Sequence, residues 1–324
     1  MIIKKLYKQF WKFVQKKDDK LNNTKKVDLS SIVKSKYNIA YGADKENNLF
    51  DIHYPIKAQR KLPTIIVMHG GGYVGGKKEN DDQYSKQLAS RGFCVVNMEF
   101  YRCNDKENKF FMNQIANFYD MYHYLKSNEE LSKFVDYDNI FLSGDSAGGH
   151  LIEMIANIQT NKLLDKDKSL LNGPNIKGVI LVSPIFGPFK LAHLPAKFFL
   201  KPLVYGPYKK TELLNKKQHG FDLLSKDFPA TIMFSAKNDF ITRQHKKMFL
   251  KKAQRLKFPL EHYDIMNGYK LFHSSIMNYP DFYPICLDKI KHFVKNVVKG
   301  KIKNCLKNDI IYEVIPTKEE EKEL

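Results

Sequence analysis

A short segment of mostly small residues, Gly144-Asp145-Ser146-Ala147-Gly148, separates two apolar segments. The apolar residues before this segment predict a buried strand, and those after it predict a helix. A serine at such a strand-to-helix turn stands clear of the backbone, because small flanking residues let the strand and the helix approach closely. Ser146 is therefore a candidate nucleophile. The amide of Ala147, at the start of the helix, is a candidate donor to a developing oxyanion.

A second glycine-rich turn lies upstream, at His69-Gly70-Gly71-Gly72. It follows residues 62–68, an apolar run that predicts another buried strand. Glycines allow backbone amides to turn toward a pocket where a side chain would block them. Gly71 and Gly72 are therefore candidate oxyanion donors beside Ala147. We expect His69 to brace this loop through hydrogen bonds rather than to act as a base.

With these two motifs in this order, the chain resembles the α/β-hydrolase superfamily and, within it, the hormone-sensitive-lipase-like esterases. The resemblance extends over residues 37–298 and includes Tyr101-Arg102 and Ser183-Pro184, each after a further predicted strand. Such esterases usually continue the Tyr-Arg pair with Leu-Ala-Pro-Glu. This chain has Cys-Asn-Asp-Lys at residues 103–106, a departure that concerns the conformation of the local loop rather than the chemistry.

The resemblance implies that an acid and a histidine follow the nucleophile along the chain, each after a later strand. Asp239 is the candidate acid, because it follows the predicted strand at residues 231–235. His273 is the candidate base, because it lies in the loop after the predicted strand at residues 261–265. In the implied arrangement, His273 takes the proton from Ser146 while Asp239 fixes the imidazole tautomer.

Other acids and histidines fit this pattern less well. Asp264 lies inside a predicted strand, and Asp281 comes after the candidate base. The remaining histidines in this comparison lie in predicted strands or helices, where we expect packing or surface roles: His53, His245, His262 and His292.

Predicted strands and helices alternate along the chain, which indicates an α/β fold with a mostly parallel central sheet and helices on both faces. We expect one catalytic domain over residues 37–300, with reactive loops at the carboxyl ends of the strands. The alternation stops between residues 186 and 229. This insertion is either a small lid over the serine or a surface excursion, and its aromatic residues favour the lid. Residues 301–324 are expected to form a charged tail.

The N-terminal segment, residues 1–36, begins with a basic amphipathic stretch. Residues 1–17 contain six lysines and no acidic residue. Their apolar side chains share one stripe of a predicted helix: Ile3, Leu6, Phe10, Phe13 and Val14. Such a helix either lies on an anionic membrane surface or docks across the mouth of the site as a cap, and the lysines favour the membrane slightly. Lysines interrupt it and no small-residue cleavage site follows, unlike a signal peptide.

Composition narrows the class of protein further. The net charge is +19, but the lysines are scattered, and no nucleic-acid-binding pattern accompanies them, so we expect no nucleic-acid partner. The glycine loops lack the Gly-Lys-Ser/Thr ending of a nucleotide site, and no metal-ligand spacing is present; neither cofactor nor metal is expected. No apolar run is long enough for a transmembrane helix. The four cysteines are expected to be buried thiols in a reducing, cytoplasmic compartment: Cys94, Cys103, Cys286 and Cys305. If the N-terminal helix lies on a membrane, we expect that membrane surface to be the inner one.

The function that these features favour is hydrolysis of a small carboxylic ester through an acyl-enzyme intermediate, and the resemblance implies short acyl groups. An amide or formamide hydrolase is an alternative, because the same triad attacks both carbonyl types. A non-catalytic, membrane-associated protein that keeps the fold is a further alternative, against which the intact serine, histidine and acid argue.

Overall fold

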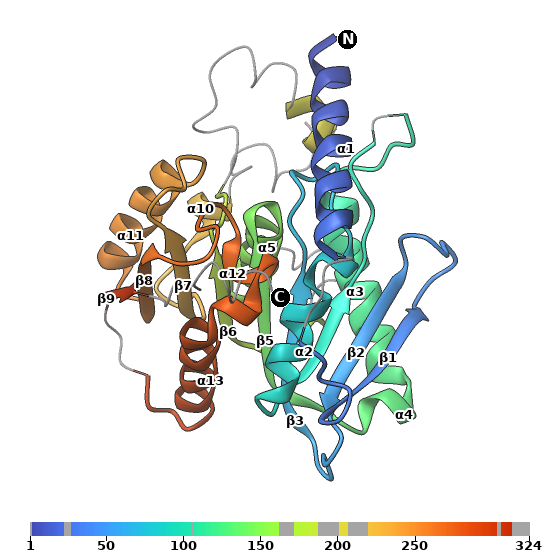
Figure 1. Ribbon diagram of the computed structural model, residues 1–324, viewed down its shortest axis with the longest axis vertical. Coiled ribbons are helices and arrows are strands. Elements are labelled where there is room, and N and C mark those ends of the chain that lie inside the picture. The colour runs from blue at the N-terminus through green and yellow to red at the C-terminus, as the bar shows by residue number, and fades with distance from the viewer. Residues whose placement is uncertain are drawn as a thin grey trace, which may run out of the picture.

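Nine strands form one sheet in the part of the chain that the structure describes (Figure 1). This computed structural model describes residues 2–22, 27–104, 106–161, 172–186, 201–206, 220–302 and 306–312. The spatial order of the strands is β1-β2-β4-β3-β5-β6-β7-β8-β9. Their bounds are Val33–Ala40 for β1, Leu49–Pro55 for β2, Leu62–Met68 for β3, Cys94–Met98 for β4, Val135–Asp145 for β5, Ile176–Val182 for β6, Ala230–Ala236 for β7, Leu260–Asn267 for β8 and Leu306–Tyr312 for β9.

Strands β3 to β9 are parallel to one another. Strand β2 is antiparallel to both of its neighbours, β1 and β4. Parallel strands that are covered on both faces consist of near-continuous apolar runs, as the sequence of β3 shows. The register pairs Met68 of β3 with Gly144 of β5. The two glycine-rich turns therefore leave the sheet side by side at its carboxyl edge.

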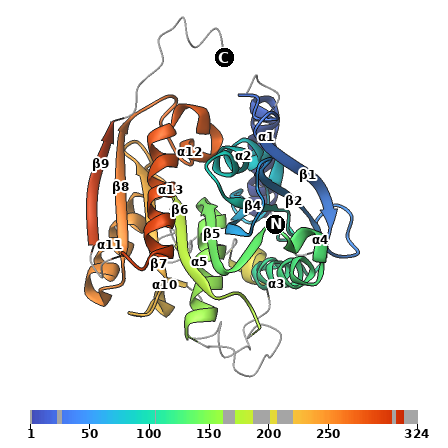
Figure 2. The same cartoon turned by 90° about the horizontal axis from the view of Figure 1, so that it is seen from below.

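Helices cover both faces of the sheet (Figure 2). One layer contains α3, α5, α10 and α11, and the other contains α2, α12 and α13. The helix bounds are Ile2–Asn22 for α1, Asp82–Ser90 for α2, Phe111–Ser127 for α3, Glu129–Ser132 for α4, Ser146–Asn161 for α5, Gly220–Leu223 for α10, Arg243–Leu256 for α11, Ser275–Asn278 for α12 and Pro284–Val298 for α13, with short 3-10 turns η1 at Lys78–Asp81 and η2 at Pro280–Phe282. This arrangement confirms the predicted α/β-hydrolase architecture.

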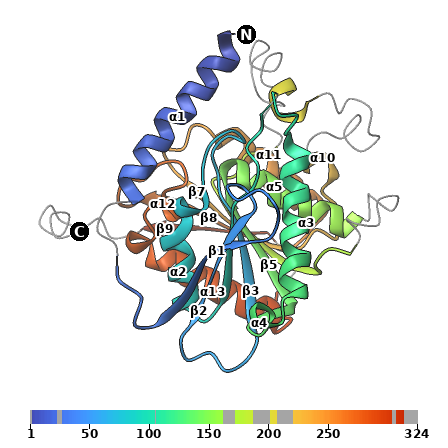
Figure 3. The same ribbon diagram turned by 90° about the vertical axis from the view of Figure 1, so that its right-hand side faces the viewer.

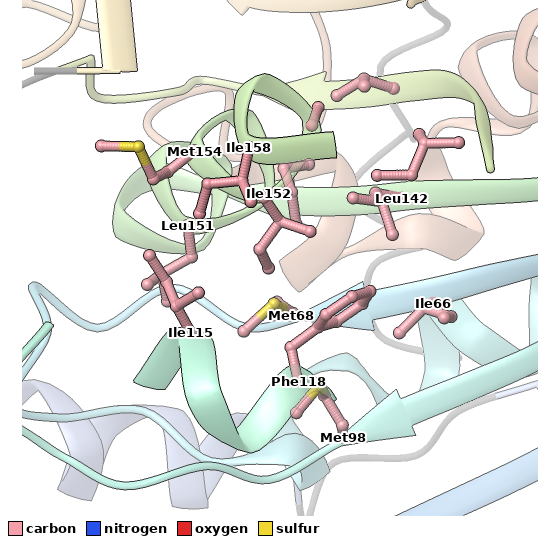
Figure 4. Close-up of a cluster of buried hydrophobic side chains, with 14 of the residues drawn as sticks. Ile66, Met68, Met98, Ile115, Phe118, Leu142, Leu151, Ile152, Met154 and Ile158 are labelled. Atoms are coloured by element: carbon pink, nitrogen blue, oxygen red, sulfur yellow. The ribbon is translucent and has the colours of Figure 1, made fainter. Parts of the chain in front are cut away.

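The core between the sheet and the α3–α5 layer is apolar and closely packed (Figure 4). Ile115 and Phe118 lie three residues apart on α3, so both point to the same side of that helix. Leu151 and Ile152 of α5 meet them above β3 and β5. Burial of such side chains contributes roughly 1.5–3 kcal/mol each, and it holds α5 against the sheet.

Two expected boundaries differ from the structure. Strand β1 begins at Val33, inside the segment assigned to the N-terminal region at residues 1–36. Strand β9 lies inside the segment expected to be a charged tail at residues 301–324, and it pairs in parallel with β8. The open edge of β8 offers unpaired backbone groups, and burial of Ile311 against the core adds to this pairing. Residues 313–324 lie outside the described residues.

The predicted insertion at residues 186–229 is described only in part, because residues 187–200 and 207–219 lie outside the described residues. Residues 201–206 form a helical turn in which Leu203, Val204 and Tyr205 are buried. Tyr205 packs its ring 5.5 Å from that of Phe111, and Cys103 lies 3.7 Å from the carbonyl oxygen of Val204. This part of the insertion therefore packs on the catalytic domain rather than on itself.

None of the described helices combines the length and the hydrophobicity that a bilayer span requires.

A buried ionic cluster joins β2 to α2. The ligand atoms of Asp51, His53 and Asp82 lie within 4.8 Å of one another, as in a metal site. However, the ammonium groups of Lys78 and Lys86 already bind the two carboxylates, at 2.9 and 2.8 Å. These cations balance the carboxylates and disfavour a divalent metal. Burial, together with the two lysines, outweighs Asp82 and lowers the pKa of His53 to about 4.

This histidine predicts a pH dependence of stability. The unfolded chain binds a proton at His53 near its ordinary pKa of 6.5, whereas the folded chain binds it only near pH 4. The free energy of unfolding should therefore fall by about 3 kcal/mol as the pH drops from 7 to 4. His53→Gln should remove this part of the pH dependence. Urea denaturation at pH 7, 5.5 and 4 measures it, and equal pH slopes for the two proteins would contradict the assignment.

Candidate active site

The turn from β5 to α5 places Ser146 in a strained conformation. Its φ of 47° is in the left-handed region, which non-glycine residues seldom occupy. The surrounding glycines make this turn possible, because a Cβ on Gly148 would lie 2.1 Å from Met68 O and 2.6 Å from His69 O. A Cβ on Gly144 would lie 2.8 Å from the carbonyl carbon of Gly148. The start of α5 thus packs directly on the end of β3, and strain of this kind is concentrated at functional sites.

The loop of residues 69–72 lies against this turn. A Cβ on Gly70 would come within 2.5 Å of Asp145 Oδ2. Gly71 and Gly72 have φ values of 121° and 57°, in the region of positive φ that favours glycine. Among the described residues, their amides donate no hydrogen bond. The amide of Ala147 lies in the first turn of α5, where amides have no partner within the helix.

His69 braces the loop, as the sequence predicted. Its Nδ1 hydrogen bonds to Gly70 O at 2.6 Å, and its Nε2 to Glu99 Oε1 at 3.0 Å. Both ring nitrogens are occupied, which leaves neither to serve as a base. Arg102 donates to Glu99 Oε1 at 3.2 Å and to Gly76 O at 2.9 Å, so it links this carboxylate to the backbone just beyond the loop.

Sequence reasoning missed Glu99. The only signal is its position between the buried strand β4 and the Tyr101-Arg102 pair. Burial raises the pKa of Glu99, but His69 and Arg102 outweigh burial and hold that pKa below its usual value. A buried carboxylate with several hydrogen bonds is a rigid anchor for a loop.

Asp239 and His273 meet at the carboxyl ends of β7 and β8. His273 Nδ1 lies 2.9 Å from Asp239 Oδ2. Asp239 also accepts hydrogen bonds from the amides of Ile241 and Thr242, at 2.9 and 3.1 Å, and from the Thr242 hydroxyl at 2.5 Å. Burial raises the pKa of Asp239, but the hydrogen bonds from His273 and Thr242 lower it to about 2. Asp239 is therefore a carboxylate under ordinary conditions.

The structure gives the rival residues other partners. Asp264 binds Lys246 at 2.6 Å, and Asp281 accepts a hydrogen bond from Gln83 at 3.2 Å. The histidines that the sequence assigned to packing are hydrogen bonded elsewhere, His53 to Ser35, His245 to Phe186 and His262 to Ser235.

The candidate residues thus fall into two groups on one edge of the sheet. Ser146 and the glycine loop lie at the ends of β5 and β3, and Asp239 with His273 lies at the ends of β7 and β8. Among the described residues, no hydrogen bond joins Ser146 to His273. Catalytic hydrogen bonds are often long without substrate, so the missing bond is no argument against these residues as a group.

Helix α1 contacts the loop of residues 69–72, and Figure 3 shows it running along the edge of the molecule toward the N-terminus. Tyr7 donates from its hydroxyl to Gly72 O at 3.0 Å, and burial raises the pKa of Tyr7 to about 12. The Trp11 indole covers the same glycine so closely that a Cβ on Gly72 would lie 2.4 Å from the ring. The helix is also held at its sides, where Lys8 donates to Asn104 and Gln15 to Asn80, each at 3.3 Å.

Solved structures of other proteins share the fold of this chain and define its fold class. Esterase B of Lactobacillus rhamnosis has the same fold, with a TM-score of 0.78 and 20% identity over 93% of this chain and 98% of that one. Brefeldin A esterase, titled a bacterial homologue of human hormone sensitive lipase, has a TM-score of 0.63 and 16% identity over 91% of this chain and 86% of that one. The fold is that of an α/β hydrolase.

The family follows from the sequence match. The model of the BD-FAE family matches residues 50–253, more than half of the chain, and the chain belongs to this family. The Arabidopsis thaliana protein named "Probable carboxylesterase 6" is 28% identical over 135 residues, which are 39% of this chain and 36% of that protein. The chain spans about a third of the length of the curated relatives it matches.

The packing of α5 on β3 yields a testable prediction. Gly148→Ala places a Cβ against the backbone oxygens of Met68 and His69, which cannot rotate away. We expect the free energy of unfolding to fall by roughly 1–3 kcal/mol, because overpacking displaces backbone. The shift should also separate Ser146 from the glycine loop, and labelling of the serine by a fluorophosphonate probe should slow at least tenfold.

The control for this prediction is Gly92→Ala, whose Cβ would meet no atom within 4 Å. It shares the added methyl group and carries backbone strain at a φ of 102°, but it lies away from the turn. Labelling at the wild-type rate is expected for this control. Wild-type labelling of Gly148→Ala would show that the contact does not position the serine.

Proposed function

We propose that this protein is a serine hydrolase that cleaves carboxylic esters. The observation that carries the proposal is the Asp239–His273 pair, 2.9 Å apart on the sheet edge from which the strained Ser146 also projects. The order serine, acid, histidine along the chain is the order of this fold. The names of the relatives and structural neighbours, carboxylesterases and esterases, support the same reaction.

The mechanism assigns one role to each group. Ser146 Oγ attacks the ester carbonyl while His273 Nε2 takes its proton, and Asp239 holds the Nδ1–H and stabilises the imidazolium. Because its pKa is about 2, Asp239 stays ionised throughout. His273 then protonates the departing alcohol. Water, activated by the same histidine, hydrolyses the acyl group on Ser146, and the cycle needs no cofactor.

The negative charge of the tetrahedral intermediate falls on the former carbonyl oxygen. The amides of Gly71, Gly72 and Ala147 are the donors that we assign to it. Such donors act only where charge develops, so each contributes about 3 kcal/mol to stabilising the transition state. The Glu99–His69–Arg102 network keeps two of them in place before substrate arrives.

We further propose short acyl groups as the preferred substrates. Aromatic side chains fill the space beside His150, one turn along α5 from the serine: Tyr73 at 2.9 Å, Phe111 with its ring 4.7 Å away, and Tyr205 behind Phe111. The similar esterase B has been crystallised with a tributyrin phosphonate, according to its title. Residues 201–206, which carry Tyr205, act as part of the lid in this proposal.

The compartment that we propose is the reducing cytoplasm. Cys94 and Cys103 are buried thiols, and burial raises the pKa of both above its usual value, which protects them from modification.

The triad assignment is tested by substitution. Ser146→Ala should abolish hydrolysis of p-nitrophenyl butyrate with an unchanged melting temperature, because its hydroxyl contributes chemistry and little packing. His273→Ala should lower kcat about 10⁴-fold or more, and Asp239→Asn somewhat less, through loss of the correct tautomer. The matched control is His292→Ala, an exposed histidine on α13, which should keep wild-type kcat/KM. A folded Ser146→Ala protein with wild-type turnover would exclude the mechanism.

Acyl preference is tested with p-nitrophenyl esters of increasing length, run beside aryl amides. We expect kcat/KM to fall about tenfold or more from butyrate to octanoate, and Tyr205→Ala to reverse part of this fall by opening space. Faster turnover of the amides than of the esters would favour the amidase alternative. An unchanged length profile in Tyr205→Ala would contradict the role given to that side chain.

A further inference from the structure

Helix α1 presents a second face whose large apolar side chains are more than half exposed. Tyr7, Trp11 and Gln15 lie four residues apart and form the docked face. The apolar stripe predicted from the sequence is on another side of the helix. Leu6 and Phe10 are 57% and 55% exposed there, and Phe13 is 57% exposed. Three large apolar side chains on one exposed stripe mark a surface for contact with another apolar phase.

Basic residues border this stripe. Lys5, Lys12 and Lys16 are exposed and fall along a single edge of the helix, at spacings of seven and four residues. Residues 1–17 contain no acidic side chain to offset them. An apolar stripe beside a row of ammonium groups complements an anionic lipid surface, where acyl chains lie beneath negative head groups.

A second exposed apolar group lies next to the candidate acid and base. Phe240 is 70% exposed, and its ring lies 5.5 Å from that of Phe272. These residues directly adjoin Asp239 and His273 in the chain, at the carboxyl ends of β7 and β8. The docked helix adjoins the glycine loop at the end of β3. Exposed apolar side chains therefore border both groups of the site on the same edge of the sheet.

We propose that this edge binds anionic lipid surfaces, with α1 as the principal contact, and that the substrates are esters held in or on such surfaces. The substrate part rests on the proposed esterase function, whereas the binding part does not. Docking through Trp11 and Tyr7 fixes the helix to the loop of residues 69–72, so lipid contact through the exposed stripe beside the docked face brings the site to the interface. In this proposal the helix has both roles, because one of its faces docks on the loop and another contacts lipid.

The test is co-sedimentation of the full chain with phosphatidylcholine–phosphatidylglycerol vesicles and with pure phosphatidylcholine vesicles. We expect binding to the anionic vesicles at low salt, weaker binding at high salt and at least tenfold weaker binding to the neutral vesicles. The triple variant Leu6→Ser/Phe10→Ser/Phe13→Ser should lower the partition coefficient at least tenfold. The triple variant Lys5→Gln/Lys12→Gln/Lys16→Gln should remove the preference for anionic lipid.

A matched control uses exposed apolar residues at the opposite edge of the sheet. Ile32, which precedes β1, Ile56, which follows β2, and Val298, the last residue of α13, are 50%, 49% and 41% exposed. Ile32→Ser/Ile56→Ser/Val298→Ser should bind vesicles like the wild type. The proposal is overturned if the wild type does not bind anionic vesicles at low salt, or if the control loses as much binding as the stripe variant.

A second measurement separates this proposal from the esterase assignment. Ser146→Ala should bind vesicles like the wild type, because lipid contact does not use the serine. For an active enzyme, the stripe variant should lower the ratio of turnover on a vesicle-bound ester to turnover on a soluble ester at least tenfold. An unchanged ratio would overturn the substrate part. Vesicle binding without any esterase activity would overturn the proposed function and leave the lipid surface standing.

Discussion

The contact of Gly148 with the backbone oxygens of Met68 and His69 is the constraint on which the rest of the site depends. No side chain fits at this position, so the start of α5 and the end of β3 can approach this closely only with glycine there. The register of β3 against β5 then brings the serine turn and the loop of residues 69–72 to the same point. The strained conformation of Ser146 is sustained by this packing, since a single residue could not hold it alone.

Around that contact, rigidity comes from buried polar groups. A buried carboxylate costs free energy unless it is hydrogen bonded, and Glu99 is bonded to His69, to Arg102 and to the amide of Lys78. Its network holds the loop through His69, while Tyr7 holds it through a hydrogen bond to Gly72 O. The loop is thus held in place by contacts that do not use the amides of Gly71 and Gly72, so these amides can donate to a ligand.

Much of the site could be predicted from the sequence because its signals are local. A glycine-flanked serine between a strand and a helix, or three glycines after a strand, imposes its backbone geometry within a few residues. Asp239 and His273 could be paired because each lies in the loop that follows a parallel strand, β7 and β8. Glu99 could not, since a single acid after a strand has no distinguishing pattern. Strand β9 was also missed, because its charged residues conceal an edge strand whose stability comes from pairing with β8 and from burial of Ile311.

The N-terminal helix shows where sequence and tertiary structure divide. Periodicity alone determined that residues 1–17 form an amphipathic helix with an apolar stripe and a basic edge, because both follow from the 3.6-residue period. Which face would dock was decided by the fold, because the aromatic side chains of Tyr7 and Trp11 meet a glycine surface that exists only once β3, β5 and α5 have assembled. Neighbouring residues determine the local backbone geometry. The contact of Tyr7 with Gly72, 65 residues apart in the sequence, depends on the shape of both surfaces in the folded protein.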